Sequence, residues 1–235
     1  MPGPSWAGDD PADLSTIGAN AASVLVELAD AAPGRRMPTL ADTCAWHRRV
    51  YDGCAVPNPA YVGRFRGDPA EPDLTGYEVG VGPDLLDGLP EKVGVLSDEV
   101  APALDDFIDG LHAAFGVLDA AIPTGRRPTT ADELHEVVVL TAEVHGEWVR
   151  IHPFANGNGR TARVWAAFIA LRYALPVFVR LKPRPADVAY ARAAKRSMGR
   201  PPDFFGDHDE ASWVFAHLLA LTLLDASCGP QGGDR

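Results

Sequence analysis

The chain has 235 residues, which suits one large domain or a core with an additional lobe, and it can bury a core without disulfide staples. Its formal net charge of −11 argues against nucleic acid as a partner, because binding to phosphate backbones requires a basic face. The three cysteines include no CxxC pair, which argues against a disulfide framework or a cysteine zinc site and favours a reducing, cytoplasmic location.

The start of the chain, Met1 to Asp10, lacks the basic residues and the apolar run of a secretory signal, so we expect no export. The two most apolar stretches, Val164 to Val179 and Trp213 to Leu224, are shorter than a bilayer span. Arg172 and Pro176 also interrupt the first of them. We therefore predict buried core helices and no membrane partner.

Apolar residues recur at helical spacing through most of the sequence, which predicts a mainly α protein. In chain order, we expect helices near residues 11–31, 39–52, 98–116, 130–149, 160–174, 186–198 and 209–226. A capped start is predicted for the fourth helix by Thr129, Thr130, Asp132 and Glu133.

We expect the chain to divide into an N-terminal helical region with a β-hairpin flap at 1–97, a core at 98–200, and a C-terminal helix with a tail at 201–235. The Gly-rich end of this tail, residues 229–235, is expected to be disordered.

Prolines and glycines punctuate the sequence between the second and third expected helices, so we expect no helix there. Two short alternating runs, Tyr61 to Arg66 and Tyr77 to Val81, predict a small hairpin. Gly67 to Gly76 would be its polar, exposed connection.

Positive charge is concentrated in one part of the sequence. From Arg160 to Arg200 there are ten Lys or Arg against a single acid, Asp187, so this stretch carries +9 and the remainder carries −20. A local anion site is compatible with this pattern, although a solvated helix face neutralised by neighbouring acids is the more common meaning of a charge cluster.

The helix expected to end near Trp148 runs into the sequence IHPFANGNGRTAR at residues 151–163. Pro153 forces His152 out of helical geometry, so a helix must stop there. An imidazole that titrates near neutrality can take a proton from a hydroxyl, which makes His152 a candidate general base. Phe154 is interpreted as an apolar anchor that holds the loop to the core.

Gly157 and Gly159 flank Asn158, a residue that tolerates positive φ, so successive amides can turn inward as an anion-binding nest. The next helix is expected to begin around Arg160, which directs its free amides and positive dipole end to the same place. Arg163 lies on the same helix face and can bind a second phosphate or the same one. Together these residues predict a cradle for a polyphosphate.

The combination of these features is far more specific than any one of them. A histidine before proline, or a Gly-Asn-Gly triplet, is usually a loop or turn residue. The full pattern H-x-F-x-x-G-N-G-R-x-x-R arises by chance in a chain of this length on the order of once in ten million. The sequence resembles the Fic family, whose signature is HPF-x-[DE]-GNGR-x-x-R, over residues 98–200.

This resemblance implies a Fic-type helical bundle with a small β-hairpin flap, and an enzyme that transfers AMP from ATP to a Tyr, Thr or Ser hydroxyl of a target protein. It makes His152 the general base. It assigns the nucleotide phosphates to the loop and the start of the next helix, at Gly157, Asn158, Gly159, Arg160 and Arg163. The expected hairpin is similar to the family's flap, which aligns the target segment by strand addition.

Two positions depart from the family pattern. Asn156 stands where the family usually carries the Asp or Glu that helps to hold Mg²⁺. An amide oxygen can ligate a hard cation but lacks the charge, so we expect ATP and water to hold the metal mainly. Ser15 to Asn20 is similar to the family's inhibitory motif [ST]-x-x-x-E-[GN], with Ala19 in place of Glu, which predicts a chain without that self-inhibition.

Other functions remain open. Asn156 raises the alternative of a nucleotide-binding regulator without catalysis that acts through a partner protein. Phosphate transfer, as in the Doc branch of the family, and removal of AMP fit less well, because the loop lysine and the inhibitory Glu are missing. A metal hydrolase built on His145, Glu147 and His152 lacks a ligand triad on one helix face.

No short motif identifies the residues that recognise the nucleotide base. Candidate walls of the base pocket are Tyr190, Arg192 and Trp213. The compositional bias toward Ala, Arg, Gly and Pro is typical of a GC-rich bacterial source.

Overall fold

The computed structural model describes residues 4–6, 8–83, 90–199 and 206–227. The expectation of a disordered end at 229–235 lies outside the described residues. The protein is mainly α, as predicted, with one small two-stranded sheet in this part of the chain. Its α-helices are α1 (Leu14–Ala31), α2 (Leu40–Val50), α3 (Val100–Ala121), α4 (Ala131–Ile151), α5 (Asn158–Arg172), α6 (Val188–Ser197) and α7 (Asp209–Ser227).

Each of these helices corresponds to one expected from the sequence, and the largest difference is at the end of α3. This helix continues past residue 116 to Ala121. Phe115 and Leu118 are buried on its inner face, and this packing outweighs the low helix propensity of Gly116. The predicted cap of α4 is confirmed, because the Thr130 hydroxyl accepts a hydrogen bond from the Glu133 amide at 3.1 Å.

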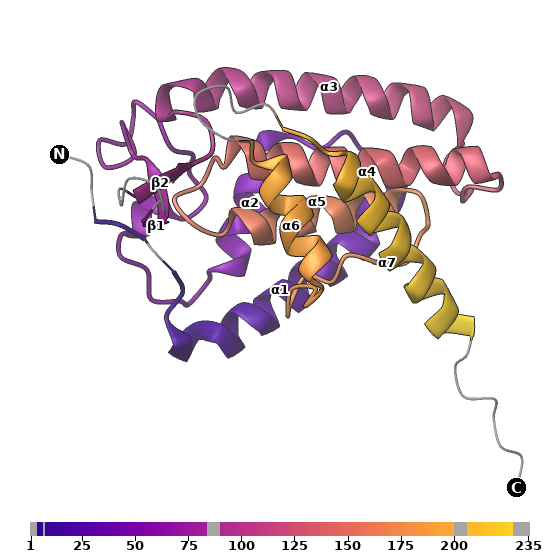
Figure 1. Ribbon diagram of the computed structural model, residues 1–235, viewed down its shortest axis with the longest axis horizontal. Coiled ribbons are helices and arrows are strands. Elements are labelled where there is room, and N and C mark those ends of the chain that lie inside the picture. Colours follow the sequence, from indigo (N-terminus) through magenta and orange to yellow (C-terminus); the bar gives the residue numbers. More distant parts are fainter. Residues whose placement is uncertain (1–3, 7, 84–89, 200–205, 228–235) are drawn as a thin grey trace, which may run out of the picture.

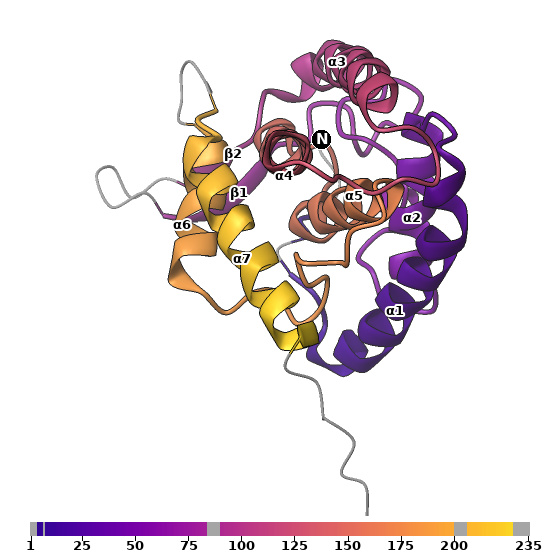
Figure 2. The ribbon, with the colours of Figure 1, turned by 90° about the vertical axis from the view of Figure 1, so that its right-hand side faces the viewer.

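Helix α5 is the centre of the fold. It packs against α4, α1 and α2, and in the end-on view it lies between α4 on one side and α1 and α2 on the other (Figure 2). Nearly all of its side chains are buried, as expected for a helix that is surrounded on several sides. Helices α3 and α4 run side by side along the long axis (Figure 1), and α6 and α7 pack together against α4.

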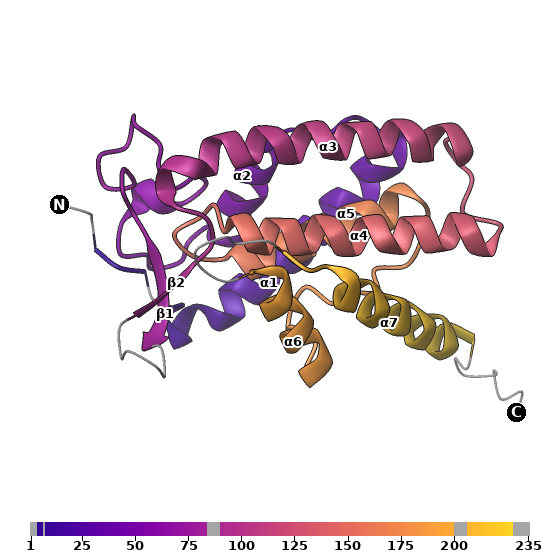
Figure 3. The same ribbon diagram turned by 45° about the horizontal axis from the view of Figure 1, so that its top comes forward.

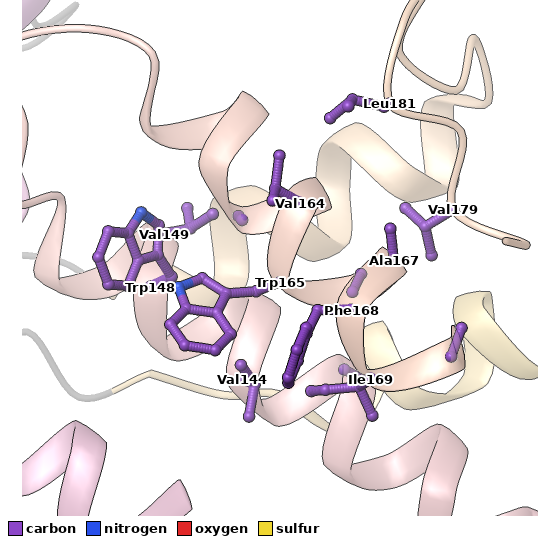
Figure 4. Close-up of a cluster of buried hydrophobic side chains, with 14 of the residues drawn as sticks. Val144, Trp148, Val149, Val164, Trp165, Ala167, Phe168, Ile169, Val179 and Leu181 are labelled. Carbon is purple, nitrogen blue, oxygen red and sulfur yellow. The ribbon is translucent and has the colours of Figure 1, made fainter. Parts of the chain in front are cut away.

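Aromatic rings form the core between α4 and α5. Figure 4 shows Trp148 of α4 beside Trp165 and Phe168 of α5, with Val179 and Leu181 from the following loop nearby. The Trp148 and Trp165 ring centroids are 6.1 Å apart, and neither side chain is exposed to solvent. This packing holds the end of α4 and the start of α5 in one rigid unit, and the loop that joins them carries the predicted site.

The position of the hairpin was predicted incorrectly. The strands are β1 (Val79–Pro83) and β2 (Pro90–Val93), paired antiparallel with Val79 opposite Val93. Residues 61–66 form no strand; Tyr61 ends a short 3₁₀ turn and the chain then bends. Gly63 has a positive φ of 71°, and the amides of Gly63 and Arg66 donate to His47 Nδ1 at 2.9 Å and to Pro153 O at 2.7 Å, so the backbone of this run is bonded to other elements instead of to a strand.

Both the hairpin and the N-terminal segment lie at the end of the bundle where α4 passes into α5 (Figures 1 and 3). Among the described residues, no helix combines the length and apolarity needed to cross a bilayer.

Candidate active site

His152 ends α4 in a left-handed backbone conformation, with φ 55° and ψ 52°. A positive φ is uncommon for a residue with a side chain, and such strained positions cluster at functional sites. The His152 amide still closes the last turn of the helix on Trp148 O at 3.0 Å, while Pro153 turns the chain away. The helix end therefore presents the imidazole at the mouth of the loop.

The tautomer of His152 follows from its hydrogen bond. Nδ1 lies 3.1 Å from the Val149 carbonyl oxygen, which can only accept, so Nδ1 carries the proton and Nε2 holds the free lone pair. Burial lowers the pKa of His152 to about 4, against a smaller opposing effect of the Val149 hydrogen bond. The side chain is thus neutral near pH 7 and can act as a base at Nε2.

Arg66 links the residues that follow β2 to the backbone at Ile151 and His152. Arg66, whose side chain is completely buried, donates from Nε to His152 O at 2.8 Å and from one Nη to Ile151 O at 3.2 Å. It also donates to Val95 O at 2.9 Å, just after β2. Gly94, with φ +81°, lies so close that an added Cβ would be 2.3 Å from the Cβ of His152. These contacts fix the distance between the hairpin and the imidazole.

The loop itself is closed by Asn158. Its side-chain oxygen accepts from the Phe154 amide and its nitrogen donates to Phe154 O, both at 2.8 Å. Since the amide side chain is used in this way and is buried, only the Asn158 backbone is left to contact a ligand. Positive φ occurs at Gly157 rather than at Asn158, and α5 begins at Asn158 instead of Arg160. The positive φ thus lies one residue, and the start of the helix two residues, before the expected positions, and the anion-binding nest stays a prediction.

His47 of α2 contacts the loop at Asn156 and Phe154, and no motif in the sequence linked this residue to the loop. Its Nδ1 accepts from the Gly63 amide at 2.9 Å, so Nε2 carries the proton and donates to Asn156 O at 3.0 Å. The His47 ring stacks on Phe154 with centroids 3.9 Å apart. Phe154 has no exposed surface, in agreement with its interpretation as an anchor.

Gly157 is required where the loop meets α2. Its φ is +81°, and an added Cβ would lie 2.8 Å from the Tyr51 ring and hydroxyl and 3.1 Å from His47 Nε2. Gly159 has helical geometry and leaves an added Cβ at an ordinary 3.5 Å from the Arg163 guanidinium. Only Gly157 therefore requires a glycine, because its backbone has a positive φ and a side chain there would clash with Tyr51.

Arg160 lies in a cluster with residues from two other elements. Its guanidinium donates to the Tyr51 hydroxyl, lies 5.1 Å from the Tyr51 ring centroid, and forms an ion pair with Asp9 from the N-terminal segment. The second carboxylate oxygen of Asp9 accepts from the Tyr51 hydroxyl at 3.2 Å and from Asn156 Nδ2 at 3.3 Å. The sequence contained no motif that linked Asp9 to the loop.

Arg163 is also predicted to contact phosphate, and its side chain is buried one turn further along α5. Nε donates to Leu181 O at 2.9 Å, and one Nη lies 3.4 Å from the Tyr190 hydroxyl. Lys182 follows Leu181, and burial and the positive charge of Arg160 lower the pKa of its amine. The basic side chains of Arg160, Arg163 and Lys182 therefore lie close to one another near the start of α5.

Asn156, the predicted metal ligand, makes hydrogen bonds to Gly157 and Asp9 through its side chain. The Asn156 side-chain oxygen accepts from the Gly157 amide at 2.7 Å and retains a second lone pair. No cluster of three or more His, Cys, Asp or Glu able to hold a metal occurs among the described residues. The donors fit a hard cation such as Mg²⁺ whose ligands come mainly from nucleotide oxygens and water.

The three residues expected to line the base pocket have different surroundings in the structure. Tyr190 is buried beside Arg163, and its hydroxyl is 2.9 Å from His145 Nε2. Arg192 is mainly exposed and pairs with Glu210, and Trp213 is 80% exposed. Only Tyr190 thus lies near the loop, through Arg163.

The residues considered for a metal hydrolase serve other purposes. His145 is fully buried against Tyr190, and burial lowers its pKa to about 3. Glu147 pairs with Arg150 and accepts from His208 at 3.4 Å.

The contacts of Arg163 also bear on the degenerate inhibitory motif. The groups that bind its guanidinium, Leu181 O and the Tyr190 hydroxyl, both lie outside residues 15–20. Ala19 is exposed on α1. Whether residues 15–20 are a degenerate inhibitory motif stays a prediction. The acidic residue that does contact an arginine of the loop is Asp9, and its partner is Arg160 rather than Arg163.

A glycine-containing loop leads into the central helix α5, with three basic side chains near the start of that helix and the neutral imidazole of His152 at the other end of the loop. The sequence profile of the Fic/DOC family matches residues 38–170. The chain belongs to the Fic/DOC family.

One curated relative and several solved structures resemble this chain. It is 29% identical over 141 residues to a Nematostella vectensis protein called protein adenylyltransferase Fic, a match that covers 60% of this chain. The chain spans only 30% of that relative's length.

Among the solved structures, a Fic-domain signalling protein from Bacteroides thetaiotaomicron has a TM-score of 0.64 at 19% identity, covering 93% of this chain and 74% of that one. The BepC protein of Bartonella tribocorum, solved with bound AMPPNP, has a TM-score of 0.53 at 13% identity, with coverages of 89% and 87%. At these identities, both structures support the fold alone.

Proposed function

We propose that this protein transfers the AMP part of ATP to a Tyr, Thr or Ser hydroxyl of a target protein, with His152 as the general base. The observation that carries the proposal is the tautomer of His152. The hydrogen bond from Nδ1 to Val149 O leaves a basic Nε2 on the imidazole at one end of the loop, and Arg160 and the start of α5 form the other end.

In the proposed reaction, the hydroxyl oxygen of the target attacks the α-phosphorus of ATP. Nε2 of His152 takes the hydroxyl proton, the bond between the α-phosphorus and the bridging oxygen breaks, and pyrophosphate leaves. The target then carries AMP on its side-chain oxygen. The backbone amides at the start of α5, together with Arg160 and Arg163, would hold the phosphates in place and stabilise the charge that develops on them.

Burial gives His152 a pKa of about 4 in the protein without nucleotide, which is low for a base that works near neutrality. A bound polyphosphate would raise this pKa, because negative charge nearby favours the imidazolium. The substrate would thereby move the pKa of its own base toward the working pH.

The divalent cation that accompanies ATP would supply charge neutralisation on the phosphates. Asn156 is the proposed ligand from the loop, through its side-chain oxygen, and nucleotide oxygens and water would complete the coordination.

The hairpin is the proposed docking place for the target. Its two strands pair only with each other among the described residues, so each has an edge that an extended segment could join. Gly94, one residue after β2, touches His152, which supports the proposal that a segment bound here would present its hydroxyl to the base.

A nucleotide-binding protein without catalysis is the second candidate, supported by the neutral Asn156 at a position where a charged ligand is expected. It would act as a regulatory partner of another protein. The two functions differ in their dependence on the base, because a missing general base lowers a reaction rate by typically 10²-fold to 10⁴-fold and leaves binding nearly unchanged.

The test is incubation of the protein with α-phosphate-labelled ATP, Mg²⁺ or Mn²⁺ and a lysate, followed by denaturation and detection of label on protein. His152→Ala should lower the rate of labelling by about 10²-fold to 10⁴-fold, whereas His217→Ala, which changes an exposed histidine on α7, should leave it unchanged. Binding of an ATP analogue without any label in the wild type would favour the regulator. Equal labelling by wild type and His152→Ala would refute the role of His152.

A further inference from the structure

Asp9 of the N-terminal segment lies in a site made of hydrogen-bond donors. Its side chain is only 12% exposed, and one carboxylate oxygen forms the ion pair with Arg160. The other oxygen accepts from the Tyr51 hydroxyl at 3.2 Å and from Asn156 Nδ2 at 3.3 Å. Each of these three partners donates, and one of them is positively charged, so the lining suits an anion and not a cation.

The Tyr51 hydroxyl is oriented toward this anion. It accepts a hydrogen bond from the Arg160 guanidinium, so its own proton is directed to Asp9. Burial raises the pKa of Tyr51, so the hydroxyl keeps that proton. Tyr51 follows the last residue of α2, Asn156 lies in the loop and Arg160 lies in α5, so three separate parts of the chain direct donors to one place.

A nucleotide phosphate requires the same donors. The proposed function assigns the phosphates to Arg160, and a phosphate resembles a carboxylate in its negative charge and in its accepting oxygens. Both anions cannot occupy the site together, because like charges repel strongly where they are partly desolvated. Asp9 and the phosphate therefore compete for one set of donors.

The amide at position 156 allows Asp9 to occupy this place. Asn156 donates to the Asp9 carboxylate through Nδ2 while its oxygen accepts from the Gly157 amide. An Asp at position 156 would instead place a second negative charge beside Asp9 and would repel it. The departure of Asn156 from the family signature is thus matched by an acidic residue from another part of the chain.

The segment around Asp9 is held on both sides. Before it, Trp6 is buried, donates its amide to the Tyr77 hydroxyl at 2.8 Å, and packs edge-on against Tyr51 with centroids 4.7 Å apart. After it, Asp13 accepts from the Ala55 amide at 2.7 Å. These contacts keep the Asp9 backbone beside the site, so an exchange of carboxylate for phosphate requires only the Asp9 side chain to turn away.

We infer that the donors of Arg160, Tyr51 and Asn156 form a phosphate subsite, and that the Asp9 carboxylate fills this subsite as an internal competitor of the nucleotide. The inference rests on the proposed function in that it requires a phosphate at Arg160. Tyr51 thereby becomes a phosphate-binding residue, and the N-terminal segment limits the affinity for the nucleotide.

The experiment measures by calorimetry the affinity for inorganic triphosphate and for a non-hydrolysable ATP analogue, each with Mg²⁺ and with EDTA. Asp9→Asn keeps the shape of the side chain and removes its charge. Asp10→Asn is the matched control, because it removes one charge from the adjacent residue and an Asn still caps the Ala12 amide. Thermal unfolding of each variant checks that it is folded.

We expect Asp9→Asn to bind both ligands about tenfold more tightly or better, by the same factor with Mg²⁺ and with EDTA. The reason is that an open state populated at about a tenth or less lowers the apparent affinity by that fraction. Asp10→Asn should bind as the wild type does.

Tyr51→Phe tests the subsite itself, and it is made in the Asp9→Asn background so that the competitor is weakened first. The ring that packs against Trp6 stays, and only the hydroxyl is lost. The affinity for triphosphate should fall about twofold to tenfold, the range for one hydrogen bond.

Four results would overturn the inference. An unchanged affinity in Asp9→Asn would show that Asp9 does not compete, and a lower affinity would make Asp9 a support for Arg160. An equal gain in Asp10→Asn would reveal a general effect of charge. A gain that appears only with Mg²⁺ or only with EDTA would tie Asp9 to the metal. Unchanged binding after Tyr51→Phe would remove Tyr51 from the subsite.

These outcomes are distinct from failure of the proposed function. If neither the wild type nor Asp9→Asn binds either ligand, both proposals are wrong. Tighter binding by Asp9→Asn in a protein that transfers no AMP would support the subsite and refute the transfer. Normal AMP transfer with the same affinity in both proteins would overturn only the role of Asp9.

Discussion

Gly94→Ala tests whether the distance between the hairpin and His152 governs catalysis. The added methyl would lie 2.3 Å from the His152 Cβ and 2.8 Å from Ile151 O, whereas ordinary contacts begin near 3.4 Å. His152 or the hairpin must therefore move by about 1 Å. Misplacement of reacting groups by that distance can lower a rate about 10²-fold.

Gly76→Ala is the matched control for this change. Gly76 has φ +71°, close to the +81° of Gly94, but nothing lies within 4 Å of its added Cβ. The backbone strain of an alanine at positive φ, about 1–2 kcal/mol, should therefore be similar in the two variants. Only Gly94→Ala should disturb the base.

The assay is the rate of transfer of labelled AMP to protein, together with the affinity for an ATP analogue. We expect Gly94→Ala to lose about 10²-fold in rate with nearly unchanged nucleotide affinity, because the clash lies at His152 and not at Arg160. Gly76→Ala should transfer normally. If the two variants retain the same rate, the contact between the hairpin and His152 does not position the base.

Three further predictions follow from the buried histidines and the helix α1. His47→Phe keeps a ring on Phe154 but leaves the Gly63 amide and Asn156 O without partners, so chemical denaturation should show a loss of about 1–3 kcal/mol for each orphaned group; an unchanged midpoint would contradict this. Burial lowers the pKa of His47 and His145 to about 3 and of His152 to about 4, so the unfolded state binds protons first on acidification. The contribution of these neutral histidines to the free energy of unfolding should be complete above pH 6.5. It should decrease toward pH 4 by at most about 1.4 kcal/mol per pH unit for each histidine. A urea midpoint that stays constant from pH 7 to 5 would refute the effect of burial. If residues 15–20 are a degenerate inhibitory motif, Ala19→Glu should lower AMP transfer, and unchanged labelling would remove that resemblance.

The helices of this protein could be predicted because their determinants are local. Apolar spacing, the Thr130 cap and the break at Pro153 act over a few residues, and the structure has a helix wherever they indicated one. The hairpin could not be placed in this way. Its first strand overlaps one expected run, but the other run, residues 61–66, is bonded to His47 and Pro153, and contacts with residues so distant in the sequence depend on the tertiary structure.

The loop shows the same division between local and tertiary causes. The sequence alone determined that His152 ends a helix, that Gly157 turns the chain and that a basic helix begins beyond it, because proline, glycine and charge act on the adjacent backbone. Only the tertiary structure decided which groups surround that loop. His47, Arg66 and Asp9 reach it from distant parts of the chain, and no local spacing encodes a contact between residues as far apart as Asp9 and Arg160.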